Sequence, residues 1–168
     1  MKRWGLTIGA IVGVAGLLLS FSIKANAAGN AKDEAAIKNV ENKIIAATST
    51  DEVMKYYDTN DIDLFDFSGP LQYQGATAVH GDLDGFFNNA KDAKGNFVEM
   101  VIVTDGKLGM VRSIQHFTWT DKDGKAQEAT LRVTDVLHKV GGNWKVIHSH
   151  VSVPVDPKTG QGQMNLKS

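Results

Sequence analysis

The second half of the sequence most constrains the fold, because three turn signals divide it into four long segments. The turns are Asp105-Gly106, Asp121-Lys122-Asp123-Gly124 and Gly141-Gly142. The segments between them alternate apolar and polar side chains, which predicts strands at residues 97–104, 108–120, 126–139 and 144–153. Connections this short place consecutive strands side by side, so we expect an antiparallel meander.

Helices precede these strands. Asn30 is a candidate cap for a first helix, and Ser49 followed by Glu52 forms a capping-box pattern that opens a second, shorter helix. A third helix is expected over residues 77–90, after two short extended segments at 62–67 and 71–74. Helices followed by a meander define an α+β domain. We expect three N-terminal helices packed in a strongly curved antiparallel sheet, which forms a cone with a central pocket.

Residues 1–27 have the pattern of a secretory signal peptide. Lys2 and Arg3 precede an apolar run of 20 residues from Trp4 to Ile23, and Ala25-Asn26-Ala27 is a small-x-small end with cleavage expected after Ala27. The run is longer than the usual signal core, so an uncleaved membrane anchor is the alternative. In either case the rest of the chain is exported to the periplasm or secreted. After cleavage we expect no membrane association.

Charge and cysteine content narrow the function classes. Cleavage would remove three of the 18 basic residues and none of the 19 acidic ones, which leaves a domain of charge −4. That balance argues against nucleic acid as a partner, because phosphate binding needs a basic face. The chain has no cysteine, which excludes thiolate nucleophiles, disulfides and iron–sulfur clusters. The sequence shows no phosphate loop, dinucleotide fingerprint or His-Glu-x-x-His motif, so no cofactor or metal is expected.

Polar side chains alternate along the last predicted strand. His148, His150 and Ser152 would point to one face, together with Trp144 and Val146. Two imidazoles placed in this way can bind a ligand oxygen, hold a metal or move protons, or they can belong to a hydrogen-bonded network of the core.

The last hairpin allows two registers. A three-residue loop would place Arg132 opposite His150 and Thr134 opposite His148, which builds a donor-rich face. A two-residue Gly141-Gly142 turn would instead place Asp135 opposite His148.

Asp66 is the other candidate for chemistry. It lies between Phe65 and Phe67, and a carboxylate among apolar neighbours suits a general base, whereas the alternatives are exposure to solvent or pairing with Arg132. Further residues are candidates for the wall of the pocket: Tyr57, Tyr73, Trp119, and one of Gln115 and His116, which point in opposite directions.

Three stretches carry a resemblance to a known family: residues 65–75, residues 131–136, and residues 144–154. The chain resembles the SnoaL-like branch of the nuclear-transport-factor-2-like superfamily, whose fold is the cone of ketosteroid isomerases. The resemblance covers residues 31–156. It divides the chain into a signal peptide (1–27), a SnoaL-like domain (28–156) and a flexible C-terminal tail (157–168).

The resemblance implies a pocket but not a single activity. The superfamily includes ketosteroid isomerases, polyketide cyclases, epoxide hydrolases and the noncatalytic association domain of calmodulin-dependent kinase. An aspartate is common at the position of Asp66, and Arg132 and Thr134 look like pocket residues, which favours the three-residue loop.

These patterns lead to three hypotheses. The first is an exported small-molecule-binding domain whose pocket favours an anionic or carbonyl-bearing ligand. Its ligand-binding residues would be Tyr73, Arg132, Thr134, His148, His150 and Ser152.

The second hypothesis is an isomerase- or cyclase-type enzyme. Asp66 would be the general base, and His148 or Tyr73 would stabilise the enolate oxygen. That function requires a deep cavity that Trp144 and Trp119 do not plug.

The third hypothesis is a structural oligomerisation module. For each of the three we expect a homodimer, formed through the convex face of the sheet with Ile147, Val151 and Val153.

Overall fold

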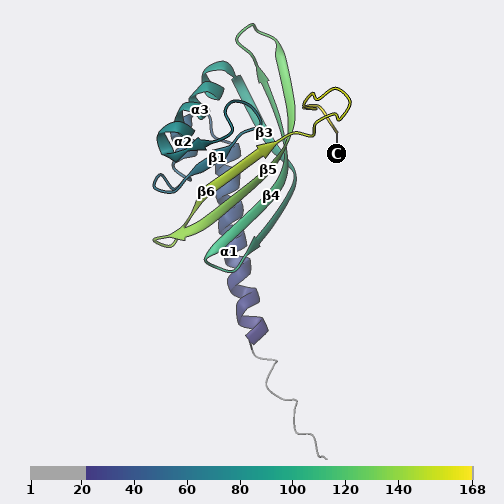
Figure 1. Ribbon diagram of the computed structural model, residues 1–168. Helices are drawn as coiled ribbons and strands as arrows, with labels where there is room; N and C mark the ends of the chain where they lie inside the picture. The colour runs from purple at the N-terminus through teal and green to yellow at the C-terminus, as the bar shows by residue number, and fades with distance from the viewer. Residues whose placement is uncertain (1–21, 168) are drawn as a thin grey trace, which may run out of the picture.

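The structure is a computed structural model that describes residues 22–167, with side chains from residue 30 onward. It contains three helices and one six-stranded sheet in this part of the chain (Figure 1). The helices are α1 (Ser22–Ile45), α2 (Thr50–Met54) and α3 (Gly75–Asn89). The strands are β1 (Asp63–Phe65), β2 (Tyr73–Gln74), β3 (Lys91–Thr104), β4 (Leu108–Thr120), β5 (Ala126–Val140) and β6 (Asn143–Ser152).

Helix α1 begins earlier than the sequence pattern indicated. It starts at Ser22 and continues through Asn30, so the predicted cap at Asn30 is wrong. The surrounding segment is rich in alanine, the residue with the highest helix propensity, which allows the helix to continue there. Residues 1–21 of the predicted signal peptide lie outside the described residues, and the predicted cleavage site lies within α1. No helix in the described range 22–167 is both long and apolar enough to cross a membrane.

Helix α2 begins at the predicted cap. The Ser49 hydroxyl accepts a hydrogen bond from the Glu52 backbone N–H at 3.4 Å. The Glu52 carboxylate reaches back to Thr48, where it accepts from the backbone N–H at 2.8 Å and from the hydroxyl at 3.1 Å. It therefore binds one residue earlier than in a capping box, but it satisfies the same end of the helix.

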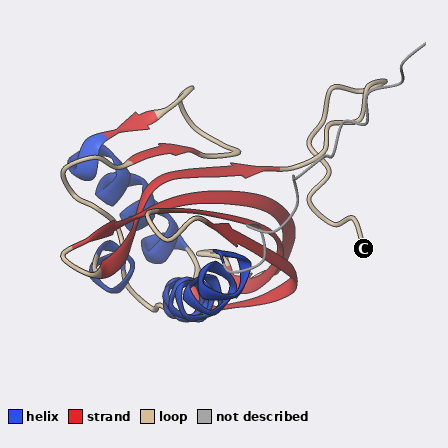
Figure 2. Cartoon of the chain, turned by 90° about the horizontal axis from the view of Figure 1, so that it is seen from below, coloured by secondary structure: helices blue, strands red, loops and turns tan. Residues whose placement is uncertain are grey.

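The sheet contains the predicted meander. Its strand order is β2-β1-β6-β5-β4-β3, and every neighbouring pair is antiparallel except β1 and β6, which are parallel. The long strands curve over the helices, which lie on the concave side (Figure 2). We call this the inner face of the sheet, and the convex side the outer face.

An extra residue in β6 determines which side chains reach the inner face. Val136 pairs with His148 but Leu137 pairs with Val146, so Ile147 is a β-bulge. Regular alternation would place Val146 and His148 on one face. The bulge separates them: Val146 is fully buried, whereas His148 points to the opposite side.

The last hairpin has the two-residue turn, so the three-residue loop that the resemblance favoured is wrong, but the pairing further along the strands matches neither alternative. Val140 pairs with Asn143 across a two-residue Gly141-Gly142 turn, in which both glycines have positive φ (56° and 85°). The bulge then shifts the pairing by one residue. Asp135 lies opposite Ser149, Thr134 opposite His150, and Arg132 opposite Ser152.

The core lies where α1 and α3 meet the inner face. Ile37 from α1, Val79 from α3, and Val111, Leu137 and Val146 from the sheet are all fully buried. Residues after β6 fold back as a small hairpin, with a bridge between Val155 and Gly162. The Thr130 N–H in β5 donates to the Met164 carbonyl at 2.6 Å, which attaches the first part of the predicted tail to the sheet.

Candidate functional site

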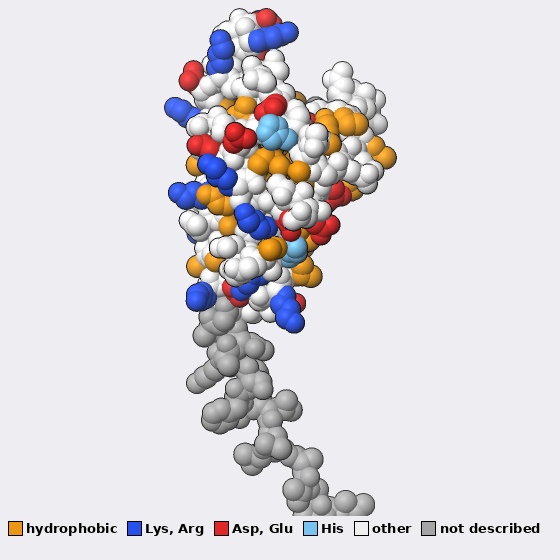
Figure 3. Space-filling model, turned by 90° about the vertical axis from the view of Figure 1, so that its left-hand side faces the viewer, with side chains coloured by type: hydrophobic (Ala, Val, Ile, Leu, Met, Phe, Trp, Pro, Cys, Tyr) orange, Lys and Arg blue, Asp and Glu red, His pale blue; other side chains and the backbone are white. Residues whose placement is uncertain are grey.

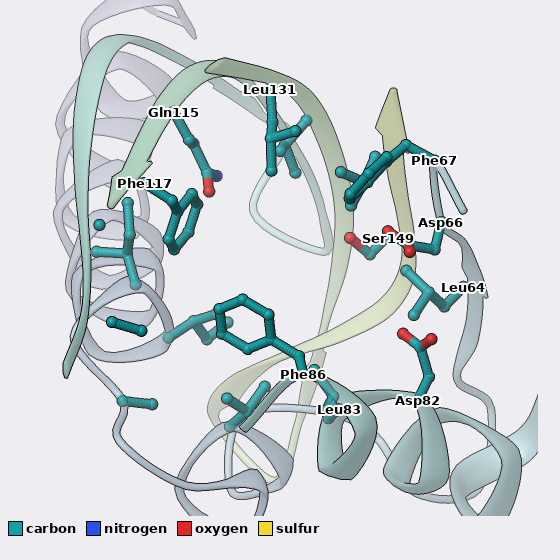
Figure 4. Close-up of a pocket in the computed structure, with 18 of the residues that line it drawn as sticks. Leu64, Asp66, Phe67, Asp82, Leu83, Phe86, Gln115, Phe117, Leu131 and Ser149 are labelled. Atoms are coloured by element: carbon teal, nitrogen blue, oxygen red, sulfur yellow. The ribbon is translucent and has the colours of Figure 1, made fainter. Parts of the chain in front are cut away.

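A cavity of about 440 Å³ lies between the inner face and the helices (Figure 4). This volume is in the range of small-molecule sites. Its wall is mostly apolar and aromatic, and includes Leu64, Phe67, Leu83, Phe86, Phe97, Phe117, Trp119, Leu131, Val133 and Val151. Its polar lining residues are Glu41, Tyr57, Asp66, Ser68, Asp82, Gln115, Asp135 and Ser149. The described lining thus holds four carboxyl groups and no lysine, arginine or histidine.

Two of these carboxyl groups form a buried pair. Glu41 on α1 is 1% exposed and Asp135 on β5 is 5% exposed, and their side chains are hydrogen-bonded to each other. Asp135 also hydrogen-bonds the hydroxyl of Ser149, which in turn hydrogen-bonds that of Tyr57. We call Glu41 and Asp135 the buried carboxyl pair.

Burial controls the protonation of this pair. Removal from water raises the pKa of Asp135 to about 6, although its bonds with Ser149 and Glu41 act in the opposite direction. Burial also raises the pKa of Glu41 well above its ordinary value, and the neighbouring charge of Asp135 raises it further. Burial also raises the pKa of the Tyr57 phenol. Tyr57 is therefore uncharged at neutral pH, and of the two carboxyl groups Glu41 is the one that keeps its proton to the higher pH.

The protonated carboxyl of Glu41 donates its hydrogen bond to Asp135. Its other oxygen, Oε1, is buried and has no hydrogen-bond partner among the described residues. A buried polar atom without a partner is rare in a folded protein, and a bound ligand is one explanation for it.

A second pair of carboxyl groups lies at the rim of the cavity. Asp66 follows β1 and accepts hydrogen bonds from the Ser68 hydroxyl at 2.9 Å and the Ser68 N–H at 3.4 Å. Asp82 on α3 is hydrogen-bonded to the Tyr73 hydroxyl. Burial raises the pKa of Asp82, and the charge of Asp66 raises it further. Figure 4 shows both side chains beside Leu64. We call Asp66 and Asp82 the rim carboxyls.

The structure places some of the predicted residues at this cavity. Asp66, Tyr57, Trp119 and Gln115 line it. Tyr73 is absent from the described lining and reaches the cavity only through Asp82. The two tryptophans do not plug it, because Trp119 lies in the wall and Trp144 is in the core. Of the two adjacent residues on β4, Gln115 points inward, whereas His116 pairs with Glu128 at 3.3 Å outside the cavity.

The remaining predicted residues lie together on the outer face. His148 Nδ1 is 2.7 Å from an Asp63 carboxylate oxygen, and the ring of Phe65 contacts both His148 and His150 edge-on. Arg132 donates to the Val153 carbonyl at 3.1 Å. Thr134 and Ser152 share this face through their pairing with His150 and Arg132. None of the five predicted residues Arg132, Thr134, His148, His150 and Ser152 lines the cavity, so the predicted polar patch exists but is separated from the pocket by the sheet.

Sequence reasoning missed three of the carboxyl groups that line the cavity. Glu41 carries a recognisable signal, because it lies on the same helical face as Ile37, Ile44 and Ile45, where an apolar side chain is expected. Asp135 was considered only as a partner of His148. Asp82 gives no signal of its own, because an aspartate on a short amphipathic helix is usually exposed. Within residues 22–167, no group of three or more His, Asp or Glu side chains is arranged to hold a metal ion.

The fold and the cavity together define a class of protein: an α+β domain whose curved sheet and helices enclose a mainly apolar cavity. The sequence identifies the family within this class. The SnoaL-like domain family matches residues 37–156, and the chain belongs to it. Among curated proteins, none matches the chain.

Solved structures share the fold at low sequence identity. An NTF2-like protein of unknown function from Pseudomonas putida is 22% identical, with a TM-score of 0.73 over 82% of this chain and 98% of that one. A putative scytalone dehydratase from Novosphingobium aromaticivorans is 15% identical, with a TM-score of 0.66 over 74% and 86%. A ketosteroid isomerase-like protein from Erwinia carotovora is 21% identical, with a TM-score of 0.62 over 72% and 95%. These similarities establish an NTF2-like fold.

Proposed function

We propose that the protein is an exported small-molecule-binding protein of the SnoaL-like family, and that the cavity is its ligand site. The observation that carries the proposal is the 440 Å³ cavity, whose largely apolar wall also contains a buried, unpartnered carboxyl oxygen of Glu41. An apolar wall with a few fixed polar groups is the usual composition of such sites. The proposal of export rests on residues 1–27.

The residues that line the cavity indicate the chemical class of the ligand. The expectation of an anionic ligand relied on Arg132, His148 and His150, which lie on the outer face. Four carboxyl groups and no basic side chain in the described lining disfavour an anion. A mainly apolar ligand with a carbonyl or hydroxyl group fits better, because the amide of Gln115 can donate to its oxygen.

Filling the cavity tests this proposal. Leu131→Trp adds an indole to the inner face, and it should weaken binding of the neutral fluorophore N-phenyl-1-naphthylamine at least tenfold. Val140→Trp makes a comparable change at a side chain that is 45% exposed beside the Gly141-Gly142 turn, and its affinity should stay within twofold of wild type. Equal binding by wild type and Leu131→Trp would place the fluorophore elsewhere and contradict the proposal. Native mass spectrometry of the exported protein would show any retained molecule.

A second candidate function is acid–base catalysis, and the observation that favours it is the geometry of the rim carboxyls. The Asp66 carboxylate can remove a proton from a carbon next to a carbonyl, while Asp82 in its protonated form donates a hydrogen bond to the enolate oxygen that forms. Return of the proton to another carbon completes an isomerisation. Two of the similar structures are titled putative scytalone dehydratase and ketosteroid isomerase-like protein.

Deuterium exchange tests the catalytic proposal without knowledge of the true substrate. In deuterated water the protein should accelerate exchange of the α-protons of 2-tetralone, as followed by proton NMR. Asp66→Asn should remove the acceleration, because the amide cannot accept the proton. The exposed Asp123→Asn serves as the matched control. If Asp66→Asn exchanges as fast as wild type, Asp66 is not the base.

We also propose a homodimer, as the sequence pattern indicated, but through different residues. Val151 lines the cavity and is therefore unavailable to the predicted surface. On the outer face, Val103 pairs with Met110, and Met110 pairs with Val136, which gives a contiguous apolar stripe. Val103 is 53% and Met110 39% exposed in the single chain. A second copy would cover this stripe.

Met110→Lys introduces a charge into the proposed interface and should shift sedimentation from dimer to monomer. Lys94→Met removes an exposed charge on the neighbouring strand and should leave the assembly unchanged. A wild-type monomer at micromolar concentration would contradict the dimer. The remaining alternative is a structural oligomerisation module. In that case the cavity binds no ligand, and cavity substitutions such as Leu131→Trp would change no binding affinity.

A further inference from the structure

The unpartnered oxygen of Glu41 places a chemical requirement on whatever occupies the cavity. The residue is 1% exposed, lines the cavity, and donates its proton to Asp135. Its Oε1 atom is therefore the carbonyl-type oxygen of a neutral carboxyl, which can only accept a hydrogen bond. A ligand carbonyl or ether oxygen cannot satisfy this atom. The ligand group that faces it must carry an N–H or an O–H.

The charge around the buried carboxyl pair favours N–H over O–H. The groups that face the pair are the Tyr57 phenol, which is uncharged, and the Ser149 hydroxyl. Asp82 adds negative charge from the rim, and His148 lies on the other side of the sheet. With Asp135 ionised, the pair carries a negative charge that no basic side chain of the described lining balances. A buried charge without a counter-charge is destabilising, and a cationic ligand would supply one.

We propose that the Glu41–Asp135 end of the cavity is a subsite for a protonated amine carried on an otherwise apolar ligand. This inference rests on the proposed small-molecule function and specifies the ligand class. A primary ammonium has three N–H donors, which suffice for Oε1 of Glu41 and for the carboxylate of Asp135. The apolar body of the ligand would lie against the aromatic wall formed by Phe86, Phe117 and Trp119.

A matched set of naphthalene derivatives tests the proposal on the full-length exported protein. The probes are 2-(1-naphthyl)ethylamine, 2-(1-naphthyl)ethanol and the carboxylate 1-naphthaleneacetate. Binding is measured by titration calorimetry at pH 7.5. We expect the amine to bind at least tenfold more tightly than the alcohol, and the carboxylate to bind most weakly. If the alcohol binds as tightly as the amine, the amine subsite is wrong and the small-molecule function stands. If none of the three probes binds, both proposals fail.

Substitution of Glu41 locates the subsite. Glu41→Met keeps the size of the side chain but removes both the acceptor Oε1 and the proton donor to Asp135. It should reduce affinity for the amine at least tenfold and change affinity for the alcohol by less than threefold. Glu41→Gln keeps a neutral acceptor oxygen and an N–H donor to Asp135, so it should retain the preference for the amine. Glu99→Met makes the same chemical change at an exposed position of β3, and both affinities should match those of wild type. An unchanged preference for the amine in Glu41→Met would overturn the proposal.

The pH dependence of the wild-type protein gives a readout that does not depend on the folding of any variant. Below about pH 6 the Asp135 carboxylate takes up a proton, so the pair loses the charge that attracts the ammonium. Affinity for the amine should fall at least tenfold between pH 7.5 and pH 5.0, while affinity for the alcohol stays within threefold. The same pH dependence for both probes, or none for the amine, would contradict an amine subsite at this pair.

Discussion

The two faces of strands β5 and β6 carry the same kinds of residue in very different surroundings. On the inner face, Asp135 and Ser149 are buried beside the cavity with no basic group in its described lining. On the outer face, His148 and Asp63 form a pair at 2.7 Å whose side chains are 27% and 37% exposed. Water and the neighbouring imidazole of His148 stabilise the outer carboxylate, whereas the inner carboxylate is removed from water and His148 acts on it only from the other side of the sheet. The ionisation of a carboxyl group on these strands therefore depends on which face of the sheet it occupies.

The two faces should differ most in how much a leucine side chain contributes to the free energy of unfolding. Leu137 points inward and is fully buried, whereas Leu108, on the adjacent strand β4, is 52% exposed. Leu137→Ala should lower the free energy of unfolding by about 3 kcal/mol, because it removes buried apolar atoms and leaves a cavity. Leu108→Ala should change it by less than about 0.5 kcal/mol. Urea denaturation of both variants measures the difference, and equal losses would mean that the outer face is also buried in an interface.

The carboxyl groups should respond to pH in a way that depends on the face. Burial raises the pKa of Asp135 to about 6 in the folded protein, above the ordinary aspartate value of 3.8. The folded state therefore binds this proton more tightly than the unfolded state. Stability from this proton is fully present below about pH 3.8 and is lost as pH rises to about 6, by up to about 3 kcal/mol for two pKa units.

Asp135→Asn should remove this part of the pH dependence and leave the part that Glu41 contributes. Its free energy of unfolding should be about 1 kcal/mol higher than that of wild type at pH 7.5, because the buried charge is gone, and should fall less steeply than that of wild type between pH 4.5 and 6.5. On the outer face, Asp63→Asn should instead destabilise by less than about 1 kcal/mol, since it removes a half-exposed pair with His148. Chemical denaturation across this pH range compares the two variants. Destabilisation by Asp135→Asn at pH 7.5 would contradict an unbalanced inner charge.

The strands could be predicted from the sequence because their signals are local. The predicted bounds of 108–120 match β4, and the turn at Gly141-Gly142 lies where two adjacent glycines allow positive φ. The faces of β6 could not be predicted in the same way. The bulge at Ile147 has no signature in the residues around it, and it arises from the pairing of β6 with β5 and β1.

One bulge was enough to misplace the predicted site. Strict alternation assigns His148 and His150 to the face of Trp144, which is in the core. The extra residue moves both histidines to the outer face and brings Ser149 to the cavity. Asp66 lines the cavity, which the hypothesis of a general base requires, and it follows the short strand β1, whose pairing with β6 contains no bulge. Glu41 was missed because it approaches from a helix, and the contact between α1 and β5 is a tertiary feature.

The smallest expected effects separate the roles of neighbouring residues on β6. His148→Ala removes an outer side chain that contacts Asp63 and Phe65, so affinity for 2-(1-naphthyl)ethylamine should stay within twofold of wild type. Ser149→Ala, one residue further, removes the hydroxyl that hydrogen-bonds Asp135 and Tyr57 on the inner face. Affinity for the same amine should then change about three- to tenfold, because the charge and orientation of Asp135 depend on that bond. Titration calorimetry on the two variants decides between the faces. A larger loss for His148→Ala than for Ser149→Ala would assign the ligand to the polar residues of the outer face and not to the cavity.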